Sequence, residues 1–340
     1  MRIVSYILFI TILTLAVTGC NNNANVPQNT SDYQKVRMVL TTSGTEFGIN
    51  TMVARKLAEL IEQESGGNVI IEVYPNDRLA GGNTTRGVKM LADGSVDLAV
   101  YTSGTLAAFD SRLPIATLPW TFDDYKEARK IIDDTGGKFY EKLLKEQGLI
   151  YLGSIHNGFR QISNNRNPVR RPEDLEGMKI RILGNEGYRL FFRLFNAEPV
   201  AMSRSEMSAA FKQNTIDGHD MSIFQSKTDK LTENEKYITI WNYAYETYIF
   251  MINSKTFDRL EPKTQELLLQ KSKEACEWGR DWLEEHERDL IKQFDESGVQ
   301  IIELSPEELE PFKNEARPLI DKLKEQYGEE ACRAFGIDWK

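Results

Sequence analysis

The amino-acid sequence predicts an α/β protein made of two units with a cleft between them. Short apolar segments alternate with amphipathic segments along most of the chain, and this alternation is typical of a mostly parallel sheet covered by helices. The alternation starts again near Leu149, which indicates a second unit. A length of 340 residues is sufficient for two such units, each with its own core.

The first unit begins with a strand expected at residues 35–40, followed by a helix from Ile49 that stops at Gly66-Gly67. Further strands are expected at 69–74 and 96–101, with a short helix around 88–91 between them. The loops 41–46 and 101–105 follow two of these strands and are polar and glycine-containing. Because ligands of open α/β sheets bind beyond the carboxyl ends of the strands, these two loops are candidates for ligand contact.

The second unit shows the same kind of pattern over a longer stretch. Strands are expected at 150–155, 159–163, 178–183, 198–202, 248–252 and 299–304, helices at 186–195, 205–213, 262–294 and 306–327, and a break at His156-Asn157-Gly158. We therefore assign residues 35–155 mainly to lobe 1 and 156–250 mainly to lobe 2. Residues 251–340 are expected to cross both lobes through a strand and a long helix, and to end in C-terminal helices.

The N-terminus has the layout of an export signal. Its apolar run from Ile3 to Val17 is shorter than the roughly 20 residues of a comfortable membrane span. The ending Val17-Thr18-Gly19-Cys20 resembles the bacterial lipobox, although an ordinary signal peptide that contains a cysteine is the alternative. We expect residues 1–19 to be a lipoprotein signal peptide and residues 20–34 a polar tether. The protein would then be exported and held in the periplasm or at the cell surface by a lipid on Cys20.

Composition and missing motifs exclude several classes of function. Lys and Arg number 42 against 51 Asp and Glu, a net charge of −9, which argues against nucleic acid or an anionic membrane surface as a partner. The motifs of serine hydrolases, P-loop nucleotide-binding proteins, zinc proteases and dinucleotide-binding enzymes are absent, so we expect no enzymatic activity and no cofactor. The three histidines are far apart in the sequence, so we expect no metal site. Cys276 and Cys332 are equally consistent with a disulfide and with two buried free thiols.

Two arginines are the strongest candidates for a chemical role. Arg181 lies between Ile180 and Ile182 in an apolar strand, and Arg160 precedes the strand-like segment 161–163. Taken alone, each would more often point to water. An arginine is nevertheless well suited to hold a carboxylate, because its planar fork donates two parallel hydrogen bonds.

Ordered motifs resolve this ambiguity. They read GGNVIIEVYP (66–75), DGSVD (93–97), LPW (118–120), NGFRQISN (157–164), PEDLEGMKIR (172–181), AEPV (197–200), SE (205–206) and DG (217–218). Over about residues 36–310 the chain thereby resembles the DctP-type substrate-binding proteins of tripartite ATP-independent periplasmic (TRAP) transporters. The resemblance implies an α/β fold of the two-lobed periplasmic-binding-protein-like kind, type II-like, with a cleft between the lobes and a long C-terminal helix.

The resemblance also implies roles for individual residues. In that family the arginine of the Lys-Ile-Arg strand forms the main salt bridge to the ligand carboxylate, which here is Arg181, and Arg160 adds a second contact. Other expected ligand contacts are Ser43, Glu46, Thr102 and Tyr243.

The chain departs from the family pattern after Asp217-Gly218, where many members have an asparagine and this sequence has Met221. A thioether cannot donate a hydrogen bond. The missing contacts are then expected from His219, Asp220 or Arg204, with Asp217 as a further candidate. Each of these could equally be a surface or packing residue.

The function implied is that of an extracytoplasmic solute-binding protein. It would capture a small organic acid by carboxylate–arginine pairing and cleft closure, and deliver it to the TRAP membrane subunits. A sugar acid such as a uronate or an aldonate is the favoured ligand, and a C4-dicarboxylate is the alternative. From other classes, an extracytoplasmic enzyme acting on sugar acids and the sensory module of a receptor are weaker readings.

Overall fold

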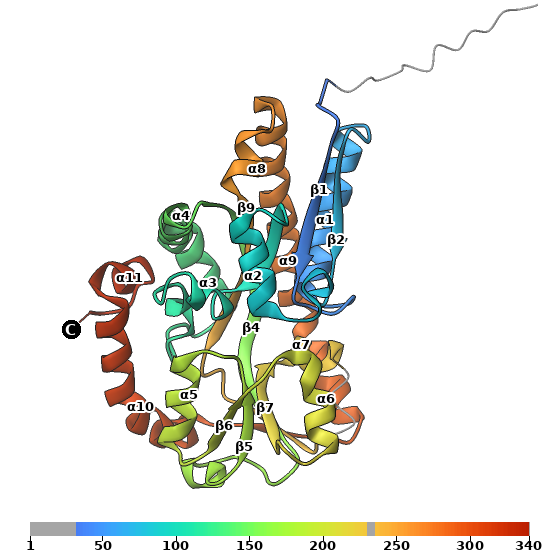
Figure 1. Ribbon diagram of the computed structural model, residues 1–340. Coiled ribbons are helices and arrows are strands. Elements are labelled where there is room, and N and C mark those ends of the chain that lie inside the picture. The colour runs from blue at the N-terminus through green and yellow to red at the C-terminus, as the bar shows by residue number, and fades with distance from the viewer. Residues whose placement is uncertain (1–31, 230–234, 340) are drawn as a thin grey trace, which may run out of the picture. The chain divides into compact units, whose positions relative to one another are not determined.

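The computed structural model describes residues 32–229 and 235–339, so the predictions for the signal peptide and Cys20 lie outside the described residues. Strands and helices alternate along this part of the chain (Figure 1). The strands are β1 (Val36–Thr42), β2 (Val69–Tyr74), β3 (Leu98–Thr102), β4 (Leu149–Asn164), β5 (Lys179–Ile182), β6 (Glu198–Ala201), β7 (Gly218–Ser222), β8 (Tyr237–Ile240), β9 (Tyr245–Asn253) and β10 (Gln300–Glu303). The helices are α1 (Ile49–Glu64), α2 (Thr84–Asp93), α3 (Tyr125–Ile131), α4 (Gly137–Glu146), α5 (Glu186–Leu194), α6 (Arg204–Lys212), α7 (Ile223–Thr228), α8 (Ser254–Asp258), α9 (Pro262–Glu296), α10 (Pro306–Tyr327) and α11 (Glu329–Ala334).

The strands form two regions that share β4. In the first sheet region the order is β2-β1-β3-β9-β4, with β1 parallel to β2 and β3, and β9 antiparallel to β3 and β4. The second sheet region contains β5 between β6 and β7, all parallel, next to the last residues of β4. There, β8 pairs with both β4 and β10. Pro199 lies in the edge strand β6, where the missing amide hydrogen costs no ladder bond.

The predicted break at His156-Asn157-Gly158 is wrong, because β4 is one continuous strand of 16 residues. Its first part pairs with β9 as far as Phe159, and its pairing with β7 begins at Arg160. Two register shifts, between Tyr151 and Gly153 and between His156 and Gly158, take up the irregularity. Gly158 has a φ of 112°, which a residue with a Cβ rarely adopts. The glycine signal in the sequence thus marks a β-bulge and not a chain break.

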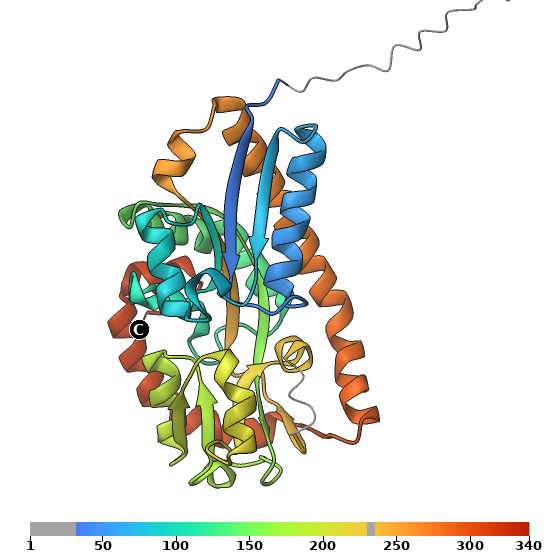
Figure 2. The same cartoon turned by 45° about the vertical axis from the view of Figure 1, so that its right-hand side comes forward.

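Helices cover both faces of the first sheet region. Leu57 of α1 and Leu268 and Ala275 of α9 pack with the apolar residues of β1 and β9 in one hydrophobic core. Leu91 of α2 and Phe139 of α4 belong to a second, larger core on the other face. Figure 2 shows α9 beside α1 and continuing toward β10, and α9 contacts α1, β4 and β10.

The last helices follow directly from a strong start signal. The Ser305 hydroxyl accepts a hydrogen bond from the Glu308 amide at 3.3 Å, and the Ser305 amide donates to the Glu308 carboxylate at 2.9 Å. This reciprocal cap, with Pro306 at the first helical position, explains why the predicted bounds of α10 agree with the structure. Phe312 of α10 packs on Phe195 next to α5, and Phe335 after α11 packs on Phe139 of α4. The end of the chain therefore joins the helices of both sheet regions.

Candidate ligand-binding cavity

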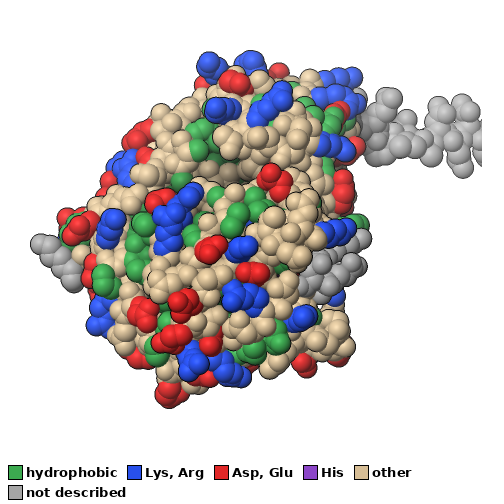
Figure 3. Space-filling view, turned by 60° about the horizontal axis from the view of Figure 1, so that its bottom comes forward, with side chains coloured by type: hydrophobic (Ala, Val, Ile, Leu, Met, Phe, Trp, Pro, Cys, Tyr) green, Lys and Arg blue, Asp and Glu red, His purple; other side chains and the backbone are tan. Residues whose placement is uncertain are grey.

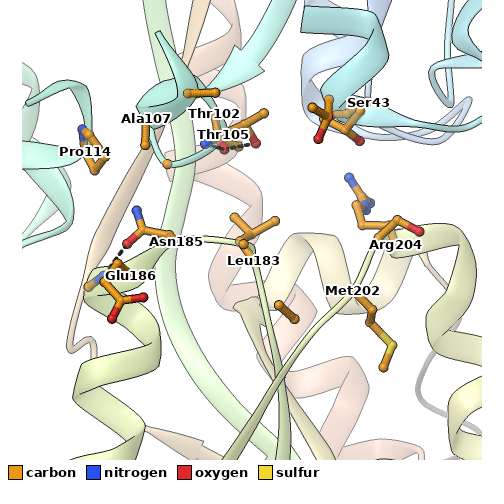
Figure 4. Close-up of a pocket in the computed structure, with 18 of the residues that line it drawn as sticks. Ser43, Thr102, Thr105, Ala107, Pro114, Leu183, Asn185, Glu186, Met202 and Arg204 are labelled. Atoms are coloured by element: carbon orange, nitrogen blue, oxygen red, sulfur yellow. Dashed lines mark hydrogen bonds between the residues drawn. The ribbon is translucent and has the colours of Figure 1, made fainter. Parts of the chain in front are cut away.

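A cavity of about 830 Å³ lies between the two sheet regions. On one side it is lined by loops that follow β1 and β3, and on the other by loops that follow β5 and β6. Figure 4 shows Ser43 facing Arg204 across this space, and Ala107 and Pro114 facing Asn185 and Glu186. All four strands are parallel within their sheet regions, so the cavity lies at the carboxyl ends of strands, where open α/β sheets bind ligands.

Arg181 is a buried cation in the cavity wall without a carboxylate partner. Its side chain lies near the end of β5 and is 1% exposed. Its Nε and Nη2 donate to the carbonyl of Met202 at 3.1 and 3.0 Å. Within residues 32–229 and 235–339, no ion pair joins it to an acidic group. Burial, followed by the positive charges of Arg160 and Arg204, lowers the pKa of the Arg181 guanidinium. An anion beside it would relieve both effects.

Arg160 lines the same cavity but is already paired with two buried carboxylates. Its Nε lies 2.9 and 3.0 Å from the oxygens of Asp220, and its Nη1 lies 3.1 Å from Glu246. Its guanidinium stacks over the Tyr188 ring at 4.5 Å. The Tyr243 hydroxyl donates to Asp220 at 2.9 Å. Burial raises the pKa of Asp220 although Arg160 opposes this, and the whole group is held in a fixed arrangement.

Glu246 connects Arg160 to the loop after β3 and was not among the predicted residues. Its carboxylate accepts hydrogen bonds from the Ser103 hydroxyl at 3.1 Å, the Gly104 amide at 2.9 Å and the Tyr188 hydroxyl at 2.5 Å. The available signal was a lone acidic residue in the apolar run 243–252. A charged side chain that is fully buried in a strand must be paired.

Arg204 is the third arginine of the cavity and belongs to the first turn of α6. Its Nε donates to Asp229 at 2.8 Å, and its Nη2 contacts the other oxygen of the same carboxylate. Its Nη1 is buried and has no hydrogen-bond partner in the described chain. Asn185 also has an unused donor, at the other end of the cavity. Its Oδ1 caps α5, while its Nδ2 is buried and has no hydrogen-bond partner in the part of the chain that the structure describes.

The structure brings five of the ten predicted residues to the cavity wall. These are Ser43, Thr102, Arg160, Arg181 and Arg204. Asp220 and Tyr243 lie behind the wall, where Asp220 holds Arg160. Neither is among the residues that line the cavity.

The other three predicted residues have partners away from the cavity lining. Glu46 forms an ion pair with Arg55 of α1, and about half of its side chain is exposed. Asp217 accepts the Lys179 amide at 2.8 Å and so holds the start of β5. His219 is buried against Glu235.

Other features of the site agree with its geometry. Met221, at the family's asparagine position, is buried in a small apolar cluster with Met207 and Phe211. Asn185, Gln225, Tyr248, Gln326 and Tyr327 line the cavity and were missed. Of these, only Asn185 had a signal, as a helix-start residue directly after a strand.

The described residues show no sign of a metal or membrane-spanning element. They contain no group of three or more His, Cys, Asp or Glu side chains placed to hold a metal ion. Cys276 and Cys332 are free and buried, which resolves the two alternatives in favour of separate thiols. Among the helices described, none has the length and apolar character needed to cross a membrane. Figure 3 shows acidic and basic side chains interspersed over one face of the molecule, without a basic patch.

Comparisons with known proteins identify the family. Residues 46–326 match the family of bacterial extracellular solute-binding proteins, family 7, DctP. The C4-dicarboxylate-binding protein DctB of Bacillus subtilis is 27% identical over 286 residues, which are 83% of this chain and 80% of that protein. The 2,3-diketo-L-gulonate-binding periplasmic protein YiaO of Escherichia coli is 28% identical and covers 79% of this chain, which spans 81% of it.

Solved structures show the same fold. A TRAP periplasmic solute-binding protein from Ralstonia eutropha H16 with bound (S)-2-acetolactate superposes with a TM-score of 0.85 at 25% identity, over 88% of this chain and 98% of that one. The sugar acid binding protein DctPAm of Advenella mimigardefordensis, in complex with galactonate, also gives a TM-score of 0.85, at 24% identity over 89% and 97% of the two chains. This likeness confirms the predicted α/β fold with its long helix α9. The chain belongs to the DctP family, the non-enzymatic periplasmic solute-binding proteins that bind small organic acids for TRAP transporters.

Proposed function

We propose that this protein captures a monocarboxylate sugar acid, such as a uronate or an aldonate, between its two lobes and delivers it to TRAP membrane subunits. The observation that carries the proposal is the buried guanidinium of Arg181, which lines the cavity and has no carboxylate partner in the described chain. A buried cation that has lost its hydration shell is stabilised strongly when an anion pairs with it. A ligand carboxylate is such an anion.

The charges around the cavity support a ligand with one negative charge. Three arginines line it, and three buried or nearly buried carboxylates pair with two of them: Asp220 and Glu246 with Arg160, and Asp229 with Arg204. Arg160 and Arg204 are thus neutralised, and among the described residues Arg181 is the one of the three arginines that forms no ion pair. One added carboxylate at Arg181 completes the local pairing, whereas a second would find each remaining arginine already occupied.

The rest of the cavity wall supports a ligand rich in hydroxyl groups. Thr102 and Thr105 lie on the first-sheet side, with their hydroxyls 2.9 Å apart. The Nδ2 of Asn185, which has no hydrogen-bond partner among the described residues, lies on the opposite side. Neutral donors and acceptors of this kind orient a polar ligand inside a cavity. Structural neighbours from Sulfitobacter and Chromohalobacter salexigens hold β-D-galacturonate and D-glucuronate.

A C4-dicarboxylate is the second candidate. The named function of the B. subtilis relative favours it, as does succinate bound in a neighbour from Sulfurospirillum deleyianum. Arg204 would be the obvious partner for a second carboxylate, because it lies in the same cavity wall as Arg181.

We further propose that the two sheet regions act as lobes that close on the ligand. The cavity is lined from both, so a ligand bound there gives a closed form contacts that an open form lacks. Only such a difference can shift the equilibrium between the two forms. An anchor at Cys20 would keep the closed form near its membrane partner. Replacing Cys20 by serine should release the protein from the membrane fraction, and retention of the variant there would contradict the anchor.

Calorimetric titration of Arg181→Ala with uronates, aldonates and C4-dicarboxylates tests the proposed function. Two charge-assisted hydrogen bonds at about 1.5–3 kcal/mol each correspond to a loss of affinity of roughly 100-fold or more. Arg181→Lys keeps the charge but not the fork, so it should recover only part of the loss. Arg37→Ala, which removes an exposed arginine of β1, should bind as the wild type does. Unchanged binding by Arg181→Ala would refute the proposal.

A further inference from the structure

Arg204 lines the cavity and is paired with Asp229, which is not among the lining residues. Arg204 lies at the start of α6 and Asp229 directly follows α7, so two separate helices hold the two partners together. The guanidinium is bonded to both oxygens of the carboxylate. Their side chains are 14% and 8% exposed, so water screens the pair weakly.

The surroundings of Arg204 would otherwise suit an anion. Gln225 and Tyr248 line the cavity next to it, and the Gln225 amide donates to the Tyr248 hydroxyl at 2.8 Å. Arg204 also has a buried Nη1 that finds no hydrogen-bond partner among residues 32–229 and 235–339. Burial is the largest single effect and lowers the pKa of Arg204, but the charge and hydrogen bond of Asp229 together with those of Tyr248 raise the pKa overall, so the guanidinium is firmly cationic. The carboxylate of Asp229, which is bonded directly to Arg204, opposes an incoming carboxylate. Glu206 also lines the cavity, but its carboxylate is bonded to the Ser203 amide.

We infer that Asp229 is a specificity-determining residue that excludes dicarboxylates by neutralising Arg204. This inference rests on the proposed function, because it assumes that Arg181 holds the first carboxylate. A second carboxylate would meet the guanidinium of Arg204, which Asp229 already neutralises. It would also lie close to the negative charge of Asp229, where little water screens the repulsion. A hydroxyl group can instead accept a hydrogen bond from Nη1 without bringing a charge. Specificity of this kind comes from an element that repels the wrong ligand.

The test compares acids that share a carbon skeleton. Galacturonate and galactarate differ by a second terminal carboxylate, as do gluconate and glucarate. Each pair is titrated calorimetrically into the wild type, Asp229→Asn and the control Asp281→Asn. The control removes a carboxylate that also pairs with an arginine, Arg129, but lies on α9 away from the cavity lining.

The wild type should prefer the monocarboxylate of each pair. Asp229→Asn should bind the dicarboxylates at least about tenfold more tightly relative to their partners, a change equivalent to about 1.4 kcal/mol, and Asp281→Asn should leave the ratios unchanged. An unchanged ratio in Asp229→Asn, with wild-type monocarboxylate binding intact, would overturn the inference alone. Failure of the wild type to bind either monocarboxylate would overturn the proposed function, and this inference with it.

A second variant keeps the inference testable if Asp229→Asn does not fold. Arg204→Gln leaves the carboxylate of Asp229 without its cation. Both members of each acid pair should then bind more weakly, and the dicarboxylate should lose more affinity than the monocarboxylate. Equal losses for the two acids would contradict the role given to Asp229.

Discussion

Arg160 and Arg181 carry the same formal charge in one cavity wall, but their neighbours give them different tasks. Arg160 is fixed by two carboxylates and a tyrosine ring, so it organises the wall before a ligand enters. Among the described residues, the side chain of Arg181 is hydrogen-bonded to the carbonyl of Met202 alone. Its charge remains available, and we assign the first contact with a ligand to it.

Replacing Glu246 by glutamine should destabilise the protein markedly. The carboxylate accepts hydrogen bonds from Arg160, Tyr188, Ser103 and the amide of Gly104, and a glutamine amide would turn a donor toward other donors. We expect the free energy of unfolding in urea to fall by about 2–4 kcal/mol. Glu72→Gln, which breaks only the exposed pair with Arg37, should change it by less than about 1 kcal/mol. Similar losses in both variants would contradict this view of Glu246.

The sequence predicted the two arginines but not their partners. Arg160 and Arg181 were identified from their positions in the sequence motifs, which fix the residue that occupies a given place in β4 and β5. These positions do not fix where a side chain points. His219 and Asp217 lie in the same motif region as Asp220, but their side chains have other partners. His219 contacts Glu235, and Asp217 accepts a hydrogen bond from the Lys179 amide. Glu246 is 86 residues from Arg160, and one sequence alone gives no sign that the two meet.

At the scale of elements, predictions succeeded where local signals were sufficient. The strand 69–74 is a β-branched run closed by Pro75, and its predicted bounds agree with those of β2. No helix was predicted for residues 125–146, although they form α3, a π turn at Ile132–Gly136 and α4. Gly136 and Gly137 weaken the helical pattern there. In the structure they make room for Phe335 and Tyr151, which would approach an added Cβ to 3.0 and 3.3 Å.

Helix α9 carries a titratable group that should make its stability depend on pH. The carboxyl oxygens of Glu287 lie 2.7 and 2.8 Å from the hydroxyl of Tyr125. Burial raises the pKa of Glu287 to about 7, although the Tyr125 hydrogen bond opposes this. The folded protein thus keeps a proton that the unfolded chain releases above about pH 4.3. The stabilisation from this group is complete below that pH and is lost as the pH rises through 7.

Glu287→Gln imitates the protonated form at every pH. Relative to the wild type, the variant should gain about 1–3 kcal/mol of unfolding free energy between pH 5 and pH 8. Chemical denaturation at both pH values measures this difference. Glu285→Gln, an exposed substitution on the same helix, should show no such trend. A difference between Glu287→Gln and wild type that does not vary with pH would argue against a raised pKa.

At the scale of the whole molecule, the chain ties its two sheet regions together repeatedly. They share β4, and the larger hydrophobic core includes Tyr101 of β3 and Ile180 of β5. The fold class could be predicted from the alternation of elements. The way α10 and α11 join both regions could not, because it depends on aromatic contacts between residues far apart in sequence.

We therefore expect residues 32–339 to unfold in a single cooperative transition, despite the two sheets. In scanning calorimetry the van't Hoff and calorimetric enthalpies should agree. A bound acid at 100 times its Kd should add about 2.7 kcal/mol and move the whole transition. Two resolved transitions, with only one of them shifted by the acid, would show that the sheet regions melt independently.

The bulges of β4 make this strand sensitive to changes of chain length. Side chains of a strand alternate between its faces, and each bulge resets that alternation. Arg160 comes two residues after the bulge glycine Gly158. Deletion of Gly158 would move each later side chain of β4 to the opposite face of the sheet. Arg160 would then exchange faces with Gln161, which bonds to Asn242. A substitution along this strand keeps the alternation of faces, whereas the deletion of a single codon would move Arg160 away from the cavity wall.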